Sequence, residues 1–91
     1  MIVSLASGKV LDAEAGELLT GANVCQRASN GDDSQKWRVS VNSDGSITLF
    51  NKMLNGVLDV EGAGAWEGSN VQIYSSNDTS AQRWDVKYVS A

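Results

Sequence analysis

The alternation of apolar and polar residues along the chain predicts short β-strands rather than helices. Val71 and Ile73 are separated by the polar Gln72, so the two apolar side chains point to one face of an extended strand. The nearest approach to a helical pattern is interrupted by Gly16. Short apolar or alternating runs predict strands at residues 2–5, 9–13, 37–41, 47–50, 56–60, 70–75 and 84–88.

Clusters of Gly, Asn, Asp and Ser separate these strands and mark turns. They lie at residues 29–34, 42–46 and 75–80. The dipeptide Asn55-Gly56 is typical of a tight β-hairpin, because both residue types readily adopt a positive φ. The pattern therefore predicts an all-β domain.

An internal repeat with an offset of 47 residues organises the chain. Val10-Leu11-Asp12 recurs as Val57-Leu58-Asp59, and Gln35-x-Trp37 recurs as Gln82-x-Trp84. The same offset joins Glu14 to Glu61, Gly21 to Gly68, Asn23-Val24 to Asn70-Val71, Ser29-Asn30 to Ser76-Asn77, and Val39 to Val86. One offset without a gap indicates a tandem duplication. We predict a single domain over residues 1–91, made of repeat one (1–44) and repeat two (45–91), each with four short strands.

Large apolar residues at repeated strand positions predict the core. Seven aliphatic positions are expected to be buried: Leu11, Leu58, Val24, Val71, Ile73, Val39 and Val86. Trp37 and Trp84 are expected to pack in the core rather than to contact a ligand. Trp66 fits either packing beneath its loop or a sugar platform, and Gln26 takes the inward place of Ile73 without an evident reason.

Composition and charge exclude several classes of function. The chain of 91 residues is 42% hydrophobic, carries a formal net charge of −4, and has no His and one Cys. Without His, nucleophilic catalysis by Ser-His or Cys-His pairs is excluded. The negative charge argues against nucleic-acid binding, which needs basic stripes. Residues 1–12 hold a short apolar run followed by Lys9, which predicts neither a signal peptide nor membrane insertion.

The repeated motifs resemble one known family. Leu-Asp, then Gly-x-Asn-Val, then Ser-Asn, then Gln-x-Trp is similar to the repeat of the ricin-type (R-type) β-trefoil lectins, which are also grouped as family 13 carbohydrate-binding modules. The resemblance covers the whole chain. It implies three such units around a pseudo-threefold axis, of which this sequence has two, and shallow sites for galactose or a related sugar.

Repeat two carries the residue types that a sugar site needs. A sugar offers hydroxyls and one apolar C–H face, so a carboxylate, amides and an aromatic ring suit it. The family pattern maps onto Asp59 as hydroxyl acceptor, Tyr74 as stacking platform and Gln72 as polar contact. Gln82 would contact the sugar or orient Asp59, and Asn77 comes from the following turn. Asp59 equally fits an Asx-turn and Gln82 a loop support, so both also have structural readings.

Repeat one carries a weaker version of the same set. Asp12, Asn30 and Gln35 are kept, but Arg27 replaces the aromatic ring and Cys25 replaces the glutamine. The position before the Gln of Gln-x-Trp, often Asn in the family, is Ala81 in repeat two and Ser34 in repeat one.

The expected function is a non-catalytic lectin module for galactose-type glycans, without metal or cofactor. The alternative is a protein–protein or structural module, because trefoils serve many functions. A glycosidase receives little support, since no acid/base pair of carboxylates is evident. Two units cannot close a threefold barrel, which leaves three alternatives. The chain is a piece of a longer protein that holds the third unit, or three chains form two complete barrels, or two chains pair in a four-unit arrangement that is no trefoil. We expect a homo-oligomer and favour three chains. Glycan binding suggests an extracellular setting.

Overall fold

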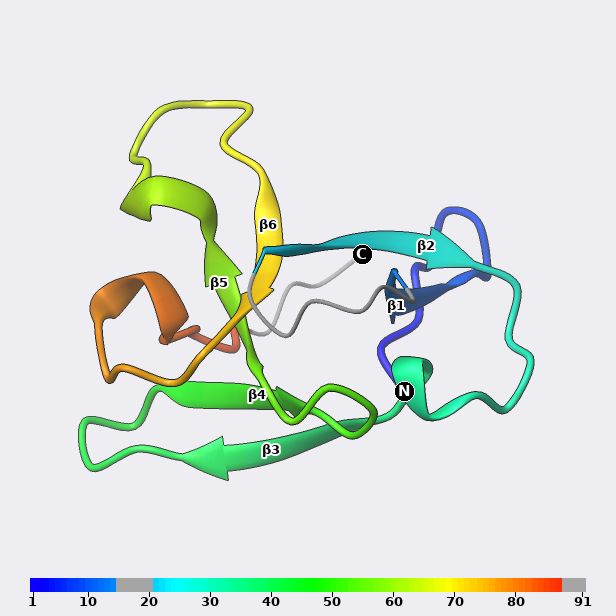
Figure 1. The fold of residues 1–91 in the computed structure, drawn as a ribbon, viewed down its shortest axis with the longest axis horizontal. Helices are drawn as coiled ribbons and strands as arrows, with labels where there is room; N and C mark the ends of the chain where they lie inside the picture. The colour runs from blue at the N-terminus through cyan, green and yellow to red at the C-terminus, as the bar shows by residue number, and fades with distance from the viewer. Residues whose placement is uncertain (15–20, 88–91) are drawn as a thin grey trace.

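The structure is a computed structural model that describes residues 1–14 and 21–87, and its regular structure is dominated by β-strands (Figure 1). The strands are β1 (Val10–Ala13), β2 (Ala22–Arg27), β3 (Trp37–Val41), β4 (Ile47–Asn51), β5 (Val57–Val60) and β6 (Val71–Tyr74). Three single turns of 3₁₀ helix follow the strands: η1 (Asp33–Gln35), η2 (Glu61–Ala63) and η3 (Ser80–Gln82). The described residues contain no α-helix, so the prediction of an all-β fold is confirmed.

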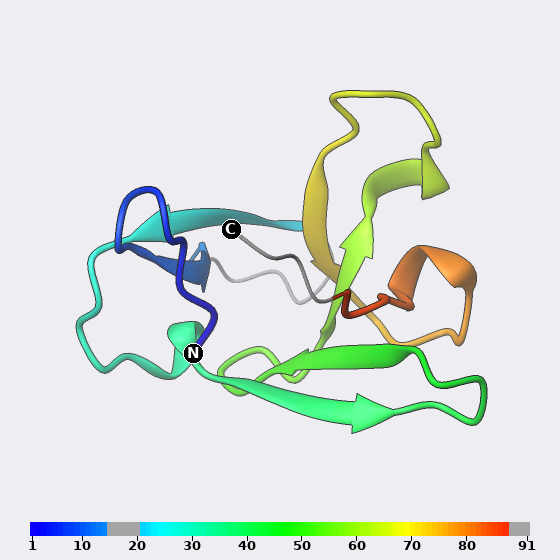
Figure 2. The same cartoon turned by 180° about the vertical axis from the view of Figure 1, so that it is seen from behind.

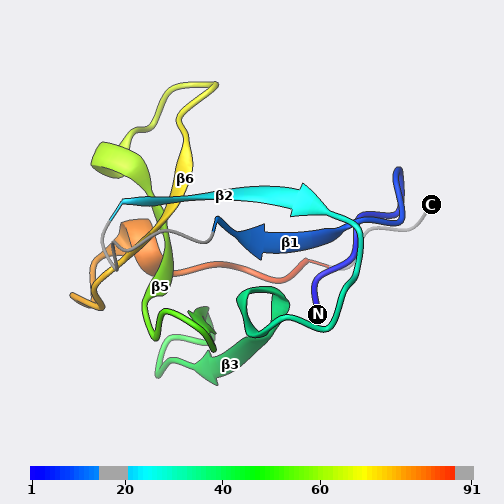
Figure 3. The same cartoon turned by 45° about the vertical axis from the view of Figure 1, so that its right-hand side comes forward.

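All six strands join one antiparallel sheet in the order β1-β2-β6-β5-β4-β3. The sheet curls into part of a barrel, with β1 and β2 on one side and the β3–β4 hairpin on the other (Figures 1 and 2). Figure 3 shows β1 and β2 running side by side at one end of the sheet. Each repeat contributes its own hairpin, β1–β2 and β5–β6, while β3–β4 joins one repeat to the next.

A hairpin forms at Asn55-Gly56, but it is wider than the tight turn that the sequence predicted, because residues 52–56 connect β4 to β5 and only Asn55 of the pair has a positive φ. Asn55 has a φ of 54°, and its amide donates to the carbonyl of Asn51 at 2.8 Å. The Asn51 amide in turn donates to the carbonyl of Gly56 at 2.9 Å, which closes the turn between β4 and β5. Asn tolerates this left-handed conformation better than most residues, which explains its place there.

Two of the predicted strands form only single bridges. Val3 pairs with Val10 near the start of the chain, and Trp84 pairs with Ile47 near the end of the described region. Residues 85–87 have no strand pairing, and Tyr88 lies outside the described residues. Both segments have a strand pattern but only one neighbouring strand at most, and a strand without partners on its edges gains little ladder hydrogen bonding.

The core lies between the hairpins of the two repeats. Its buried apolar side chains are Val10, Ala13, Leu49, Val57, Leu58 and Ile73. The prediction that Val39 and Val86 are core residues is wrong, because they are 56% and 78% exposed. Val39 lies opposite Leu49 in the β3–β4 ladder, so both side chains point to the same face. Other parts of the chain pack on this face at Leu49, whereas the same face is open to solvent at Val39.

The two tryptophans of the repeated motif are half-buried and hydrogen-bonded. The indole N–H of Trp37 donates to the carbonyl of Leu11 at 3.1 Å, and that of Trp84 donates to the carbonyl of Leu58 at the same distance. Each ring therefore fastens the last strand segment of its repeat to the strand that carries the Leu-Asp motif. This is a structural role, as the sequence predicted.

The polar Gln26 at an expected inward position has a simple explanation. Its equivalent Ile73 is fully buried because the start of β2 pairs with β6 at that point. No described strand covers the corresponding edge of β2, and Gln26 is exposed there, accepting a hydrogen bond from the Ser7 hydroxyl at 2.7 Å. The two repeats differ at this position because Ile73 lies at a paired edge, whereas Gln26 lies at an edge of β2 without a described neighbouring strand.

Candidate functional site

A buried carboxylate held by two glutamines lies at the end of β5. Asp59 is 5% exposed, and its Oδ2 accepts a hydrogen bond from the Gln82 Nε2 at 2.9 Å. Its Oδ1 accepts one from the Gln72 Nε2 at 3.3 Å. Gln72 comes from β6 and faces Asp59 in the β5–β6 ladder, whereas Gln82 comes from η3, 23 residues away. Three predicted residues from three elements therefore form one network.

Gln82 acts as the support of this network. Besides its bond to Asp59, its Nε2 donates to the carbonyl of Ser75 at 2.8 Å, and its Oε1 accepts from the Asn77 amide at 2.9 Å. With these three bonds both ends of the side chain are engaged, and Gln82 is 1% exposed. Its geometry favours the role of orienting Asp59 over that of contacting a ligand.

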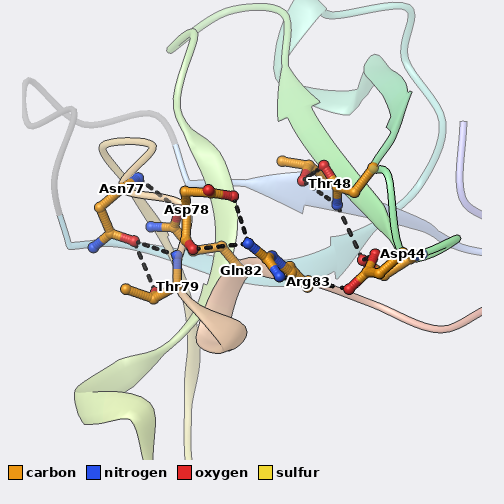
Figure 4. Close-up of polar contacts among 9 residues, drawn as sticks. Asp44, Thr48, Asn77, Asp78, Thr79, Gln82 and Arg83 are labelled. Atoms are coloured by element: carbon orange, nitrogen blue, oxygen red, sulfur yellow. Dashed lines mark hydrogen bonds and ion pairs between the residues drawn. The ribbon is translucent and has the colours of Figure 1, made fainter.

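The Asn77 side chain stabilises the turn that leads into η3. Its Oδ1 accepts from the Thr79 amide at 3.2 Å and from the Thr79 hydroxyl at 2.7 Å, an Asx-turn that Figure 4 shows beside Gln82. The Asn77 Nδ2 has no hydrogen-bond partner among residues 1–14 and 21–87, so this amide can donate to a ligand.

The network borders a hollow of about 310 Å³, which we call the repeat-two hollow. Four of the five predicted site residues line it, namely Asp59, Gln72, Tyr74 and Asn77, and Gln82 stands behind Asp59. The wall also includes Ala81, which the sequence marked as the position where the family often has Asn, and four residues that sequence reasoning missed: Gly62, Ala63, Thr79 and Ser80. Small side chains in two loops have no chemical signature of their own. They lie in the loops between the repeated Leu-Asp, Gly-x-Asn-Val and Gln-x-Trp motifs, and this position in the repeat is the signal that could have indicated them.

The hollow combines a polar floor with an aromatic wall. Asp59 retains acceptor capacity, because a carboxylate has about four lone-pair positions and two are used. Tyr74 is 40% exposed, so part of its ring is available for contact. The volume is at the lower end of the range for small-molecule sites, roughly 300–1,000 Å³. The arrangement suits a small polyhydroxylated ligand with one apolar face.

Repeat one reproduces the network almost atom for atom. The Gln35 Nε2 donates to the Asp12 Oδ2 and to the carbonyl of Ala28, both at 3.0 Å. The Gln35 Oε1 accepts from the Asn30 amide at 3.0 Å. Asp12 and Gln35 are 3% and 1% exposed, as buried as their counterparts. The Gln of Gln-x-Trp therefore supports the Asp of Leu-Asp in both repeats.

The repeat-one hollow, about 290 Å³, has a different wall. It is lined by Asp12, Glu14, Arg27, Asn30, Asp32 and Ser34. The Arg27 guanidinium lies 3.9 Å from the Asp12 Oδ2 and 4.0 Å from the Glu14 Oε1, so it is drawn toward the carboxylates. At the position where repeat two has the aromatic ring of Tyr74, repeat one has Arg27, which is ion-paired with Asp12 and Glu14. Cys25, in place of Gln72, is a half-buried free thiol.

An ion-pair chain ties the η3 loop to the turn between the repeats. Arg83 lies 2.8 Å from the Asp78 carboxylate and 3.5 Å from that of Asp44 (Figure 4). The Asp78 hydrogen bond and charge raise the pKa of the Arg83 guanidinium above its usual value. Hydrogen bonds from the Ser46 hydroxyl and amide, with Arg83 nearby, lower the pKa of Asp44. The loop next to the hollow is thus anchored to residues 44–46.

Trp66 does not contribute to either hollow. Its side chain is 72% exposed, in the loop between η2 and β6, and it lines neither cavity. The described residues hold no group of three or more His, Cys, Asp or Glu side chains arranged to bind a metal ion. No helix in the described ranges is long and apolar enough to cross a membrane.

A curled sheet built from two consecutive repeats, each with a Gln-supported Asp beside a shallow hollow, defines a partial β-trefoil. The model of the ricin-type β-trefoil lectin domain-like family matches residues 1–74, and the chain belongs to this family. The resemblance inferred from the repeated motifs is therefore confirmed.

A solved structure supports the same fold. The crystal structure of ThreeFoil, a designed 3-fold symmetric protein, superposes with a TM-score of 0.86 at 39% sequence identity over 90% of this chain. This chain spans 59% of the length of that protein. No curated protein matches the chain.

Proposed function

We propose that the chain is a non-catalytic lectin module that binds galactose-type or related sugars in the repeat-two hollow. The observation that carries the proposal is the Asp59 carboxylate, fixed by two glutamines yet with acceptor positions left, beside a partly exposed Tyr74 ring. Membership of the ricin-type lectin-like family supports carbohydrate binding in general.

Each residue of the hollow has a distinct role in this proposal. Asp59 accepts hydrogen bonds from two sugar hydroxyls, which is the strong, charge-assisted kind. Tyr74 packs against the apolar C–H face. Gln72 and Asn77 complement the remaining hydroxyls through their amides. Gln82 positions Asp59 and stays out of contact.

Repeat one takes the part of a weaker site, with Asp12, Arg27, Asn30 and Gln35 in the corresponding places. A sugar would have to displace Arg27 from its ion pairs with Asp12 and Glu14 and would find no flat ring. Single sites of this shallow kind bind weakly, so useful affinity comes from several sites acting together.

Catalysis is not part of the proposal. Hydrolysis of a glycosidic bond uses two carboxyl groups about 5–9.5 Å apart on either side of the scissile bond. Asp59 is the one acidic side chain among the described residues that line the repeat-two hollow. The lining of the repeat-two hollow therefore supports sugar binding rather than hydrolysis.

The exposed apolar side chains favour a second role in self-association. Val41 in β3 is 73% exposed, and Val86, which repeats the position of Val39 beyond the Trp84 bridge, is 78% exposed. We propose a homo-oligomer of three chains, and the same surfaces keep open the alternative of a protein-interaction module without sugar binding.

Calorimetry with galactose and lactose, backed by a glycan array, tests the lectin function. The key comparison is Asp59→Ala against Asp12→Ala, because both remove a buried Asp supported by a Gln and so carry a similar cost in stability. We expect Asp59→Ala to abolish binding and Asp12→Ala to leave most of it. The proposal would be overturned if the wild type bound no sugar across a broad glycan panel, or if Asp12→Ala lost sugar binding while Asp59→Ala kept it.

A further inference from the structure

The two repeats meet through a pair of identical residues. The Asn70 Nδ2 donates to the Asn23 Oδ1 at 2.7 Å, and these residues stand at the same position of the repeat, 47 apart. Beside them the Gly21 amide donates to the carbonyl of Ile73 at 2.7 Å, and Ala22 pairs with Ile73 where β2 begins beside β6 (Figure 1). In the backbone pairing repeat one uses its Gly-x-Asn edge and repeat two uses its Ile73 edge, so this pairing is head-to-tail, whereas the Asn23–Asn70 bond joins identical positions of the two repeats.

A head-to-tail interface leaves one unused half on each repeat. The Gly-x-Asn edge of repeat two, Gly68 to Asn70, contributes the Asn70 Nδ2 to the interface, but the Gly68 amide has no backbone hydrogen-bond partner among residues 1–14 and 21–87. Within the described chain, the Asn23 Nδ2 and the Asn70 Oδ1 also lack partners. A third repeat would therefore find an acceptor on Asn70 and a donor on Asn23, closing a ring of three asparagines.

An uncovered apolar face accompanies these unused edges. We call it the open face, and it consists of Ile2, Val39, Val41 and Val86. Val39 shares its face of the sheet with the buried Leu49, Val86 is the repeat equivalent of Val39, and Ile2 is the repeat equivalent of Leu49. The four side chains are 36%, 56%, 73% and 78% exposed. Val39 and Val41 lie on the side of the sheet that carries Leu49, and Ile2 and Val86 are assigned to the open face by repeat equivalence.

We propose that the open face and the unused edges dock one repeat of a further copy of this chain, so that three chains pool six repeats into two closed three-repeat barrels. This inference deepens the oligomer proposed above by naming its surface. The docked unit must present both halves of the head-to-tail interface, and each repeat of this chain carries both. The threefold symmetry of ThreeFoil, of which this chain spans 59%, supports a place for one more unit.

The proposal requires one chain to separate its two repeats. A whole second copy would add two units where one fits, so the third chain gives one repeat to each barrel. Its hinge is the turn at residues 42–46, where the Asn42 amide donates to the carbonyl of Ser46 at 2.8 Å. Opening this turn exchanges the β3–β4 pairing within a chain for the same pairing between chains, as in domain swapping.

The test is the mass of the full chain in solution, measured without sugar by light scattering and sedimentation over a range of concentrations. We expect three times the chain mass of 9.7 kDa. Asn23→Asp keeps the Oδ1 that accepts from Asn70 but loses the donor that faces the third unit, so the single chain keeps its internal bond. Val86→Asp places a charge on the open face. Each change should weaken assembly about tenfold or more.

Met53→Asp is the matched control, because Met53 is 39% exposed but lies outside the open face and the unused edges. It should keep the wild-type mass, and circular dichroism should show the same β content in all variants. A wild type that stays at one or two chains at every concentration overturns the proposal, and so does an oligomer that neither Asn23→Asp nor Val86→Asp weakens. Sugar binding is measured separately, so its absence leaves this result unaffected.

Discussion

The side-chain amide of Gln82 donates to the buried carboxylate of Asp59 at 2.9 Å, and Gln35 holds Asp12 in the same way at 3.0 Å. The Gln of the repeated Gln-x-Trp motif is thus a support that lies behind the hollow. The Trp of the motif fastens the same unit through its indole hydrogen bond. The motif that identifies the family from sequence encodes the frame of the site more than its contact surface.

Removing the support should therefore affect affinity in one repeat only. Gln82→Ala leaves Asp59, the Ser75 carbonyl and the Asn77 amide without their partner, and we expect a loss of about 1–3 kcal/mol in unfolding free energy. Sugar affinity should fall as well, because Asp59 keeps only the longer hydrogen bond from Gln72, at 3.3 Å. Urea unfolding and calorimetry measure the two effects.

Gln35→Ala provides the control for this pair of effects. It breaks the same three contacts in repeat one and should cost a similar amount of stability, while sugar affinity in repeat two stays close to the wild-type value. If Gln82→Ala destabilises the chain but leaves the affinity intact, the positioning role of Gln82 is refuted.

Trp84→Phe removes the hydrogen bond of the indole and keeps part of its packing. A six-membered ring is kept, but the bond from the Trp84 Nε1 to the carbonyl of Leu58 is lost together with part of the indole packing, so we expect a cost of at least about 0.5–1.5 kcal/mol. Trp37→Phe breaks the equivalent bond to Leu11 and should cost about the same. Thermal unfolding followed by circular dichroism measures both, and no change in either variant would show that these bonds contribute nothing net.

Arg27→Tyr should improve the repeat-one site. The change removes the guanidinium that lies near Asp12 and Glu14 and supplies the aromatic ring that repeat two has at Tyr74. We expect the number of sugars bound per chain in calorimetry to rise toward two. Arg27→Ala, which frees the carboxylates without adding a ring, should give a smaller gain, and equal behaviour of the two variants would argue against a stacking role for the ring.

Acid should weaken the turn between the repeats through Asp44. Because hydrogen bonds from Ser46 lower its pKa in the folded state, ionised Asp44 stabilises the fold above its unfolded-state pKa. That contribution is lost as the pH falls through the lower folded-state value. Urea midpoints between about pH 5 and pH 2 should therefore decline more steeply for the wild type than for Asp44→Asn, and parallel curves would contradict this.

Much of the fold followed from local pattern and repetition. The alternation around Ile73 located β6 to within a residue at each end, and Asn55-Gly56 located its hairpin. The repeat also indicated that Asp59 and Gln82 belong to one unit, and the structure places them in contact. These features depend on short-range chemistry, which a single sequence contains in full.

The failures of the core prediction share one physical cause. Val39 and Val86 have the pattern of core residues, yet burial depends on what covers a face, and the covering unit is not encoded by the strand itself. Gln26 is the converse, a polar residue at a core position that lies on an uncovered edge. Ala63 of the hollow was missed for a different reason, because its contribution is shape, which has no signature in residue type.

Ala63→Gly should stabilise the chain. Repeat two has three non-glycine residues with positive φ, Asn55, Ala63 and Asp78, and their equivalents in repeat one are Gly8, Gly16 and Gly31. Asn and Asp tolerate the left-handed region, but Ala at a φ of 50° carries a cost of about 1–2 kcal/mol. The Gly variant loses about 0.4–1 kcal/mol of stability because its unfolded chain has more conformational freedom, so the relief of strain is the larger effect. We expect a rise of about 0.5–1 kcal/mol in unfolding free energy from urea titration. Ala65→Gly, in the same loop without a positive φ, serves as the control and should lower stability, and a loss in both variants would show that Ala63 is unstrained.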